Sequence, residues 1–150
     1  MEIERKFKVK RLPGGLEGYP KSHIQQAYLC TEPVVRVRQR DESFWLTCKG
    51  KGLLSREEFE LPLTRAAYEH LLAKADGTVI TKDRWCIPYG PHTIELDVFR
   101  ETLAPLMLAE VEFLTEADAN AFQPPDWFGE EVTFDPAYCN SNLSKGGTQK

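Results

Sequence analysis

Acidic and basic side chains occupy alternate positions along several short segments of the chain. Glu2, Glu4 and Lys6 alternate at the start of the sequence. Arg36 and Arg38 alternate with valines further on. Carboxylate oxygens are the ligands that Mg²⁺ and Mn²⁺ prefer, whereas arginine and lysine bind phosphate oxygens. The two kinds of segment together predict a site for a metal-bound polyanion such as a polyphosphate.

The alternation has the period of a β-strand, in which successive side chains point to opposite faces of the sheet. It therefore places each charged set on one face and the intervening residues on the other. The pattern predicts strands over residues 2–9, 25–30, 33–40, 44–49, 56–63, 78–87, 92–99 and 107–114, and one helical turn near 15–19.

Two segments have the signals of short helices. Thr64 is a suitable N-cap for a helix over residues 66–75, which Gly77 would end. The second helix is predicted from Thr115, where T-E-A-D resembles a capping box, to about Phe122. Many strands with few helices predict a mainly β (α+β) protein.

The charged positions of the predicted strands are sorted into acidic and basic groups. The acidic positions are Glu2, Glu4, Glu58, Glu60, Glu95, Asp97, Glu110 and Glu112, and the basic positions are Lys6, Arg36, Arg38, Arg40, Lys49, Lys82 and Arg84. Exposure to water would explain the charged face of any one strand. It explains less well why acidic and basic residues are sorted strand by strand over seven strands. We expect a closed barrel with helices over the apolar outer face and the charged face inside. Burying so many charges is unfavourable, and a bound ligand would offset that cost.

Composition narrows the class of protein. The formal net charge of −4 argues against nucleic-acid binding through the whole surface. The longest apolar stretch, residues 103–109, is too short to span a bilayer, and the acidic N-terminus is no secretory signal. The four cysteines have no metal-site spacing, so we expect reduced thiols in a cytoplasmic protein without a membrane partner.

The ordered motifs resemble the CYTH proteins, also called triphosphate tunnel metalloenzymes. The E-x-E-x-K signature of that family stands here at residues 2–6. The other matching motifs are QAYL (26–29), RVR (36–38), LTCKG (46–50), EEFE (57–60), TKDRW (81–85), IELDVF (94–99), AEVEF (109–113) and EVTFDPAYCNSNL (131–143). Two stretches depart from the family pattern, at residues 104–106 and 130–131.

The resemblance implies an eight-stranded antiparallel closed β-barrel with a few short helices outside and one or two Mg²⁺ or Mn²⁺ ions in its tunnel. It implies catalytic roles for Glu2, Glu4 and Lys82, and metal ligation by Glu2, Glu4, Asp97, Glu110 and Glu112. The implied substrate-binding residues are Lys6, Arg36, Arg38, Lys49, Arg84, Glu58 and Glu60, with Lys82 also in the phosphate cradle and Lys145 as a further candidate. For Glu58 and Glu60 the resemblance leaves two other roles open: holding a second metal ion or orienting basic side chains. Residues 1–145 would form a single domain followed by a tail, 146–150.

The implied activity is metal-dependent hydrolysis of a small-molecule triphosphate. We expect inorganic tripolyphosphate as substrate, because the compact chain has no insertion that would read a base or a thiazolium ring. Three alternatives remain open: a class IV-type adenylate cyclase, a thiamine or nucleoside triphosphatase, and a module that binds polyphosphate or nucleotide without turnover. The resemblance is also compatible with a homodimer.

Overall fold

The protein folds around one strongly curled antiparallel sheet, seen in a computed structural model that describes residues 2–52 and 54–144. The strands are β1 (Glu2–Val9), β2 (Lys21–Thr31), β3 (Val34–Arg40), β4 (Ser43–Lys49), β5 (Ser55–Arg56), β6 (Glu58–Pro62), β7 (Asp76–Tyr89), β8 (His92–Arg100), β9 (Met107–Glu112) and β10 (Phe128–Glu131). The helices are α1 (Arg65–Leu72), α2 (Glu116–Ala121) and α3 (Asn140–Leu143), with 3₁₀ turns η1 (Leu16–Gly18), η2 (Glu101–Leu103) and η3 (Pro136–Tyr138).

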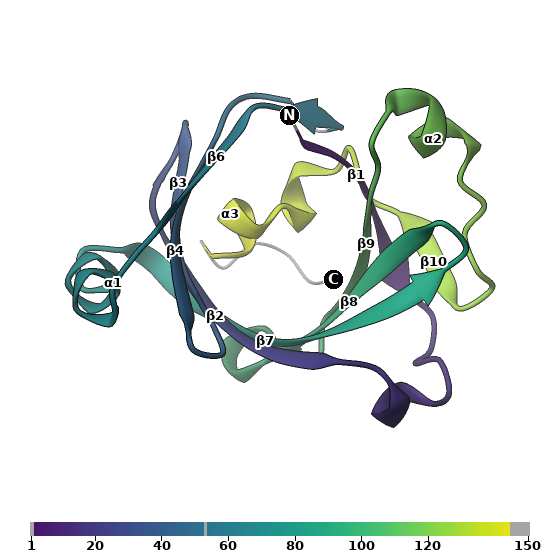
Figure 1. Cartoon of the computed structure of the whole chain (residues 1–150), viewed down its shortest axis with the longest axis horizontal. Coiled ribbons are helices and arrows are strands. Elements are labelled where there is room, and N and C mark those ends of the chain that lie inside the picture. The colour runs from purple at the N-terminus through teal and green to yellow at the C-terminus, as the bar shows by residue number, and fades with distance from the viewer. Residues whose placement is uncertain (1, 53, 145–150) are drawn as a thin grey trace.

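The strand order brings the two ends of the sheet together. The order is β10-β1-β9-β8-β7-β2-β3-β4-β6, and the short strand β5 pairs with β1. Since only Glu57 separates β5 from β6, the segment 55–62 contacts β1 at one end and β4 at the other. Figure 1 shows the resulting ring of strands around a central opening. A tunnel-like enclosure therefore forms, although no continuous ladder joins β6 to β1 within the described ranges.

All eight predicted strand ranges are strands in the structure. The predicted range 56–63 is divided into β5 and β6, and β10 was not predicted, which brings the sheet to ten strands. The helical turn expected near residues 15–19 is η1. Lys145 and the tail expected at 146–150 lie outside the described residues.

Both predicted helix starts are capped as expected. Thr64 Oγ1 accepts a hydrogen bond of 3.0 Å from the backbone N–H of Ala67, and Thr115 Oγ1 accepts one of 3.0 Å from Asp118. These bonds satisfy N–H groups that have no partner within a helix. The first helix ends at Leu72, earlier than predicted, and β7 already begins before Gly77.

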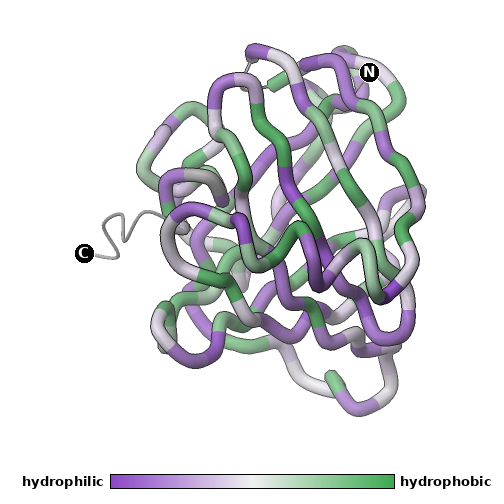
Figure 2. Tube along the Cα trace, turned by 90° about the vertical axis from the view of Figure 1, so that its left-hand side faces the viewer, coloured by the Kyte–Doolittle hydropathy of each residue, from purple (hydrophilic) through white to green (hydrophobic). Residues whose placement is uncertain are grey.

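The apolar side chains of the strands lie mainly on the outside of the ring, beneath α1 and α2. Under α1, Tyr68 packs against Val37 and Phe44. Under α2, Phe7 and Phe122 belong to a larger apolar cluster. Figure 2 shows hydrophilic and hydrophobic residues alternating along the strands. The predicted arrangement, with apolar faces outward and charged faces inward, is confirmed.

The C-terminal segment with η3 and α3 does not cover the outside of the ring as α1 and α2 do. Figure 1 shows η3 and α3 lying across the opening of the ring. Leu143 of α3 is fully buried in an apolar cluster that includes Ile80, Phe99 and Leu108. The interior is therefore apolar where this segment packs. Over the parts of the chain that the structure describes, no helix has the length and apolar character needed to cross a membrane.

Candidate functional site

A charged cavity of about 230 Å³ lies inside the ring. Its charged lining residues are Glu2, Glu4, Lys6, Arg36, Arg38, Arg40, Lys49, Arg56, Glu58, Glu60, Arg84, Glu95, Glu110, Glu112 and Asp135. These side chains come from nearly every strand because each strand presents its alternating charged face inward. The structure thus brings together all the predicted site residues except Lys82 and Asp97, which lie in the wall behind the cavity, and Lys145, which is not described.

An acidic corner forms where β1, β6 and β9 approach one another. Glu2, Glu58 and Glu112 each offer a carboxylate oxygen, and these atoms lie within 4.8 Å of one another. Such a set suits a divalent cation that prefers oxygen ligands. The family resemblance implied metal ligation by Glu2 and Glu112 and, for Glu58, either substrate binding or a second metal.

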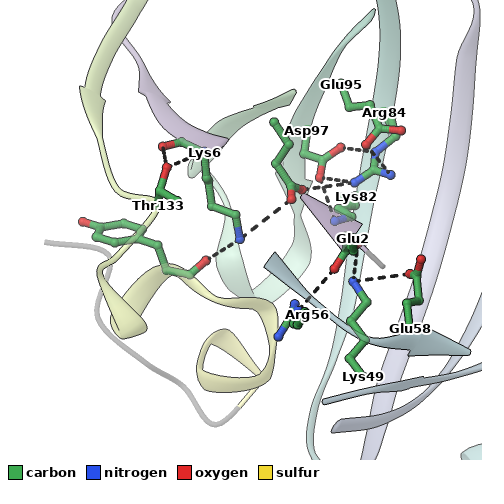
Figure 3. A network of polar contacts seen from close by, with 12 residues as sticks. Glu2, Lys6, Lys49, Arg56, Glu58, Lys82, Arg84, Glu95, Asp97 and Thr133 are labelled. Carbon is green, nitrogen blue, oxygen red and sulfur yellow. Dashed lines mark hydrogen bonds and ion pairs between the residues drawn. The ribbon is translucent and has the colours of Figure 1, made fainter. Parts of the chain in front are cut away.

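Glu2 also contacts two bases in the wall of the cavity. Its carboxylate accepts hydrogen bonds from Lys49 Nζ at 2.9 Å and from Arg56 Nε at 3.2 Å (Figure 3). Burial opposes ionisation of Glu2, but Lys49 and Arg56 outweigh it and hold the pKa of this carboxyl below its usual value. Glu2 is therefore ionised, as a metal ligand must be.

Glu4 and Glu112 lack this compensation. They face each other in the β1–β9 ladder, and neither forms a salt bridge with any described residue. Burial, followed by the charges of Glu110 and Glu2, raises the pKa of Glu4 to about 8. Burial together with Glu2 and Glu95 also raises the pKa of Glu112. A bound cation would supply the positive charge that this part of the cavity lacks, so the residues present fit a divalent metal.

An ion-pair network forms the wall behind the cavity (Figure 3). Arg84 donates to both oxygens of Asp97 at 2.7 and 2.8 Å, and Lys82 Nζ lies 2.7 Å from the same carboxylate. Arg84 also contacts Glu110 at 3.4 Å and Glu95 at 3.3 Å. Asp97, predicted as a metal ligand, is thus already neutralised by two bases.

Burial changes the proton affinities within this network. Burial opposes ionisation of Asp97, but Arg84 and Lys82 outweigh it and lower the pKa of that carboxyl. Burial lowers the pKa of Lys82 to about 7 against the attraction of Asp97. Lys82 is fully buried. It is not among the residues that line the cavity, and its charged neighbours there are Asp97 and Arg84.

Two arginines of β3 have no carboxylate partner in the described chain. Arg36 Nη2 donates to Thr47 Oγ1 at 3.2 Å, and Arg38 Nε donates to Gln26 Oε1 at 2.7 Å. Neither guanidinium forms a salt bridge within residues 2–52 and 54–144. Burial together with Arg36 and Arg84 lowers the pKa of Arg38 to about 9, which leaves it charged at neutral pH.

Three buried side-chain nitrogens on this side of the cavity have no hydrogen-bond acceptor in the described chain. They are Arg36 Nε on β3, Gln26 Nε2 on β2 and Lys82 Nζ on β7, the last held only by its ion pair. These strands are neighbours in the sheet. Buried donors normally find partners, so this wall is short of acceptors. An anion rich in oxygen would supply an acceptor to Arg36, the one of the three whose side chain lines the cavity.

Lys6 is held by the C-terminal segment. Its Nζ donates to the carbonyl oxygen of Tyr138 at 3.0 Å and lies 4.0 Å from Glu110. Its backbone N–H donates to Thr133 Oγ1 at 2.9 Å. Burial opposes its charge, but Glu110 and Glu4 outweigh burial and raise the pKa of Lys6. Residues far apart in the sequence therefore fix this base at the cavity.

Sequence reasoning missed four residues at or behind the site. Arg56 and Gln26 share the inward alternation of their strands, and this signal was present in the sequence. Thr133 and the Tyr138 carbonyl oxygen gave no comparable signal, because they lie in a segment without periodicity.

A strongly curled antiparallel sheet with carboxylates on one inner wall and uncompensated guanidinium groups on another defines a tunnel-type site for metal-bound anions. The chain belongs to the CYTH domain family, whose model matches residues 1–143. The resemblance inferred from the motifs is confirmed.

Two curated relatives match nearly the whole chain. One, named inorganic triphosphatase, is from Nitrosomonas europaea and is 44% identical over 95% of this chain and 96% of its own length. The other, with the same name, is from Acetivibrio thermocellus and is 38% identical over 96% and 93% of the two chains.

Solved structures have the same fold. A crystal structure described as an inorganic triphosphatase is 38% identical, covers 97% of this chain and 95% of its own, and has a TM-score of 0.72. A Hippeastrum protein described as a putative adenylyl cyclase with a dominant triphosphatase activity has a TM-score of 0.63 at 14% identity, covering 80% of this chain and 83% of its own. At that identity the likeness concerns the fold alone.

Proposed function

We propose that the protein is a divalent-metal-dependent hydrolase that cleaves a phosphoanhydride bond of inorganic tripolyphosphate. The observation that carries the proposal is the division of the cavity into an acidic corner and a basic wall. Glu2, Glu58 and Glu112 converge on one side, while Arg36 and Arg38 have no carboxylate partner on the other. A metal-bound polyphosphate complements both sides.

Glu2, Glu58 and Glu112 would hold Mg²⁺ or Mn²⁺. The ion supplies, when bound, neutralisation of phosphate oxygens and a water molecule of lowered pKa. Phosphoryl transfer needs positioning and charge stabilisation more than covalent help from the protein. Two Arg side chains, Arg36 and Arg38, bind phosphate oxygens and stabilise the charge that develops on them.

Glu4 is placed to accept the proton of the attacking water. Its carboxylate stands beside the acidic corner and opposite Glu112. A bound cation would offset the burial and neighbouring negative charges that raise its pKa to about 8 in the metal-free protein, so the ionised carboxylate would be available as a base. Lys6 and Lys49 add positive charge to the cavity lining. Lys82 acts from behind by holding Asp97, and through it Arg84.

The lining favours an inorganic substrate. Apart from Tyr28, Val34 and Val132, nearly every side chain that lines the cavity is charged or polar. A base or thiazolium ring would need a flat apolar surface, and the cavity offers little. The support from the curated relatives is their shared name, inorganic triphosphatase. Cys30, Cys48 and Cys86 are free thiols, which supports the proposed cytoplasmic location.

The test uses the full chain with tripolyphosphate, thiamine triphosphate and ATP, each with Mg²⁺, Mn²⁺ or EDTA. Phosphate, pyrophosphate and cyclic AMP are measured. We expect phosphate and pyrophosphate from tripolyphosphate only when metal is present. No metal-dependent product from any substrate would contradict the enzyme proposal, and cyclic AMP from ATP would identify a cyclase instead.

A further inference from the structure

Gln26 lies on the inner face of β2, behind the basic wall of the cavity. It stands directly opposite Arg38 of β3 and Ile80 of β7 in the two flanking ladders. Its side chain is fully buried. The amide oxygen accepts the hydrogen bond of 2.7 Å from Arg38 Nε. Nε is the guanidinium nitrogen bonded to the aliphatic part of the arginine side chain. The hydrogen bond to Gln26 therefore leaves both terminal nitrogens of Arg38 unused.

The orientation of the amide is fixed by this contact. Turning the amide over would place Nε2, a donor, against Arg38 Nε, another donor. In the observed orientation Nε2 has no acceptor among the described residues. A buried donor without an acceptor destabilises the fold. Gln26 therefore keeps its hydrogen bond to Arg38 at the cost of leaving its own Nε2 without a partner in the described chain.

Arg84 and Arg38 both line the cavity, but they are held in opposite ways. Arg84 is gripped by Asp97, whose carboxylate neutralises it. Arg38 is gripped by a neutral amide, so its charge is not consumed by the group that positions it. The terminal nitrogens of Arg38 make no hydrogen bond within the described ranges, and Arg38 lines the cavity.

We propose that Gln26 is a positioning residue that fixes the guanidinium of Arg38 from behind while leaving its charge available to a phosphate group. The proposal rests on the proposed triphosphatase function. It deepens that function by explaining why this position carries an amide: a carboxylate of the same size would hold Arg38 equally well but would compete with the substrate for its charge.

Two variants separate positioning from neutrality. Gln26→Glu keeps the acceptor and adds a charge, and Gln26→Met keeps the approximate volume and removes the acceptor. With tripolyphosphate and saturating Mg²⁺, we expect Gln26→Glu to raise KM about tenfold or more, with kcat changed much less. Its melting temperature should be unchanged or higher, because an ion pair with Arg38 forms. Gln26→Met should raise KM by a smaller factor.

Gln39→Glu is the matched control. Gln39 follows Arg38 on β3, faces the outside of the ring and donates to the backbone oxygen of Asp41. The variant adds the same charge without reaching the cavity, so its KM should stay within about twofold of wild type.

The outcomes distinguish the two proposals. If the wild-type protein does not hydrolyse tripolyphosphate, the proposed function fails. If the wild type is active and both Gln26 variants fold with unchanged KM, the role of Gln26 is overturned while the function stands. Loss of the folded state in both variants would also overturn it, because Gln26 would then serve the fold. If only Gln26→Glu unfolds, the KM of Gln26→Met decides.

Discussion

Glu4 and Glu112 stand opposite each other on β1 and β9, and neither has a basic partner at salt-bridge distance in the described chain. Other acids of the cavity are neutralised: Glu2 by Lys49 and Arg56, and Glu110 by Lys6 and Arg84. Glu4 and Glu112 therefore add uncompensated negative charge beside the acidic corner.

The stability of the metal-free protein should depend on pH through Glu4. Its pKa is raised from 4.5 to about 8 on folding, so the folded protein keeps a proton that the unfolded chain releases. Glu4 therefore contributes stability below its unfolded pKa that is lost as pH rises through about 8. We therefore measure the melting temperatures of Glu4→Gln and wild type in EDTA from about pH 5 to pH 9. The melting temperature of the variant minus that of wild type should increase as pH rises.

Divalent metal provides the control for this experiment. Mg²⁺ stabilises the ionised carboxylates, so the advantage of Glu4→Gln at high pH should shrink when EDTA is replaced by Mg²⁺. Parallel pH profiles for the two proteins in EDTA would contradict the assignment of a raised pKa to Glu4.

Glu112→Gln should impair turnover without harming the fold. The variant removes one of three converging carboxylates and no packing volume. We expect kcat/KM for tripolyphosphate at limiting Mg²⁺ to fall about a hundredfold or more, with partial recovery at high Mg²⁺. Phosphate release at graded Mg²⁺ concentrations measures this. Glu69→Gln, on the exposed side of α1, is the matched control and should behave as wild type.

Arg36→Met should weaken substrate binding. Arg36 is buried at the cavity with Thr47 as its hydrogen-bond partner, and its charge has no carboxylate to satisfy it. A charge-assisted hydrogen bond contributes about 1.5–3 kcal/mol, so KM for tripolyphosphate should rise about 10- to 100-fold. Arg65→Met on α1 removes an exposed arginine and should leave KM unchanged. An equal effect of both variants would mean that only net charge matters.

Arg5→Met should lower stability and spare substrate binding. Arg5 faces outward from β1, donates to both oxygens of Glu131 at 2.9 and 2.7 Å, and donates to the carbonyl of Ala119 at 2.8 Å. It thereby ties β10 and α2 to β1. We expect a loss of about 1–3 kcal/mol in the free energy of unfolding, measured in urea, with KM unchanged. Arg11→Met removes a highly exposed ion pair with Asp126 and should cost far less.

The strands and their inward charged face could be predicted because charged and apolar residues alternate with period two in the sequence. β10 and α3 could not. The segment Phe128–Glu131 is too short to show alternation, and it is held by the distant Arg5. The segment Asn140–Leu143 contains poor helix formers, and the burial of Leu143 among side chains of other strands stabilises it.

The sequence predicts which side of the sheet the site residues face, but not at what level of the tunnel they lie. Alternation states which side of the sheet a residue occupies, whereas its level along the tunnel depends on how neighbouring strands are offset. Lys82 and Asp97 share the inward face with Arg84, yet both are fully buried and only Arg84 lines the cavity. Glu58 meets Glu2 and Glu112 only through the folding of three strands, a grouping that no single segment reveals.

The contact between Lys6 and the carbonyl oxygen of Tyr138 joins residues 132 positions apart. During synthesis, β1 therefore leaves the ribosome long before the segment around Tyr138 that contacts it. Closing so long a loop is entropically unfavourable until the final contacts form, which makes such pairings late events in folding. The cavity is therefore complete only after the segment around Tyr138 has joined β1, so a ligand that needs the intact cavity would bind only after this last contact has formed.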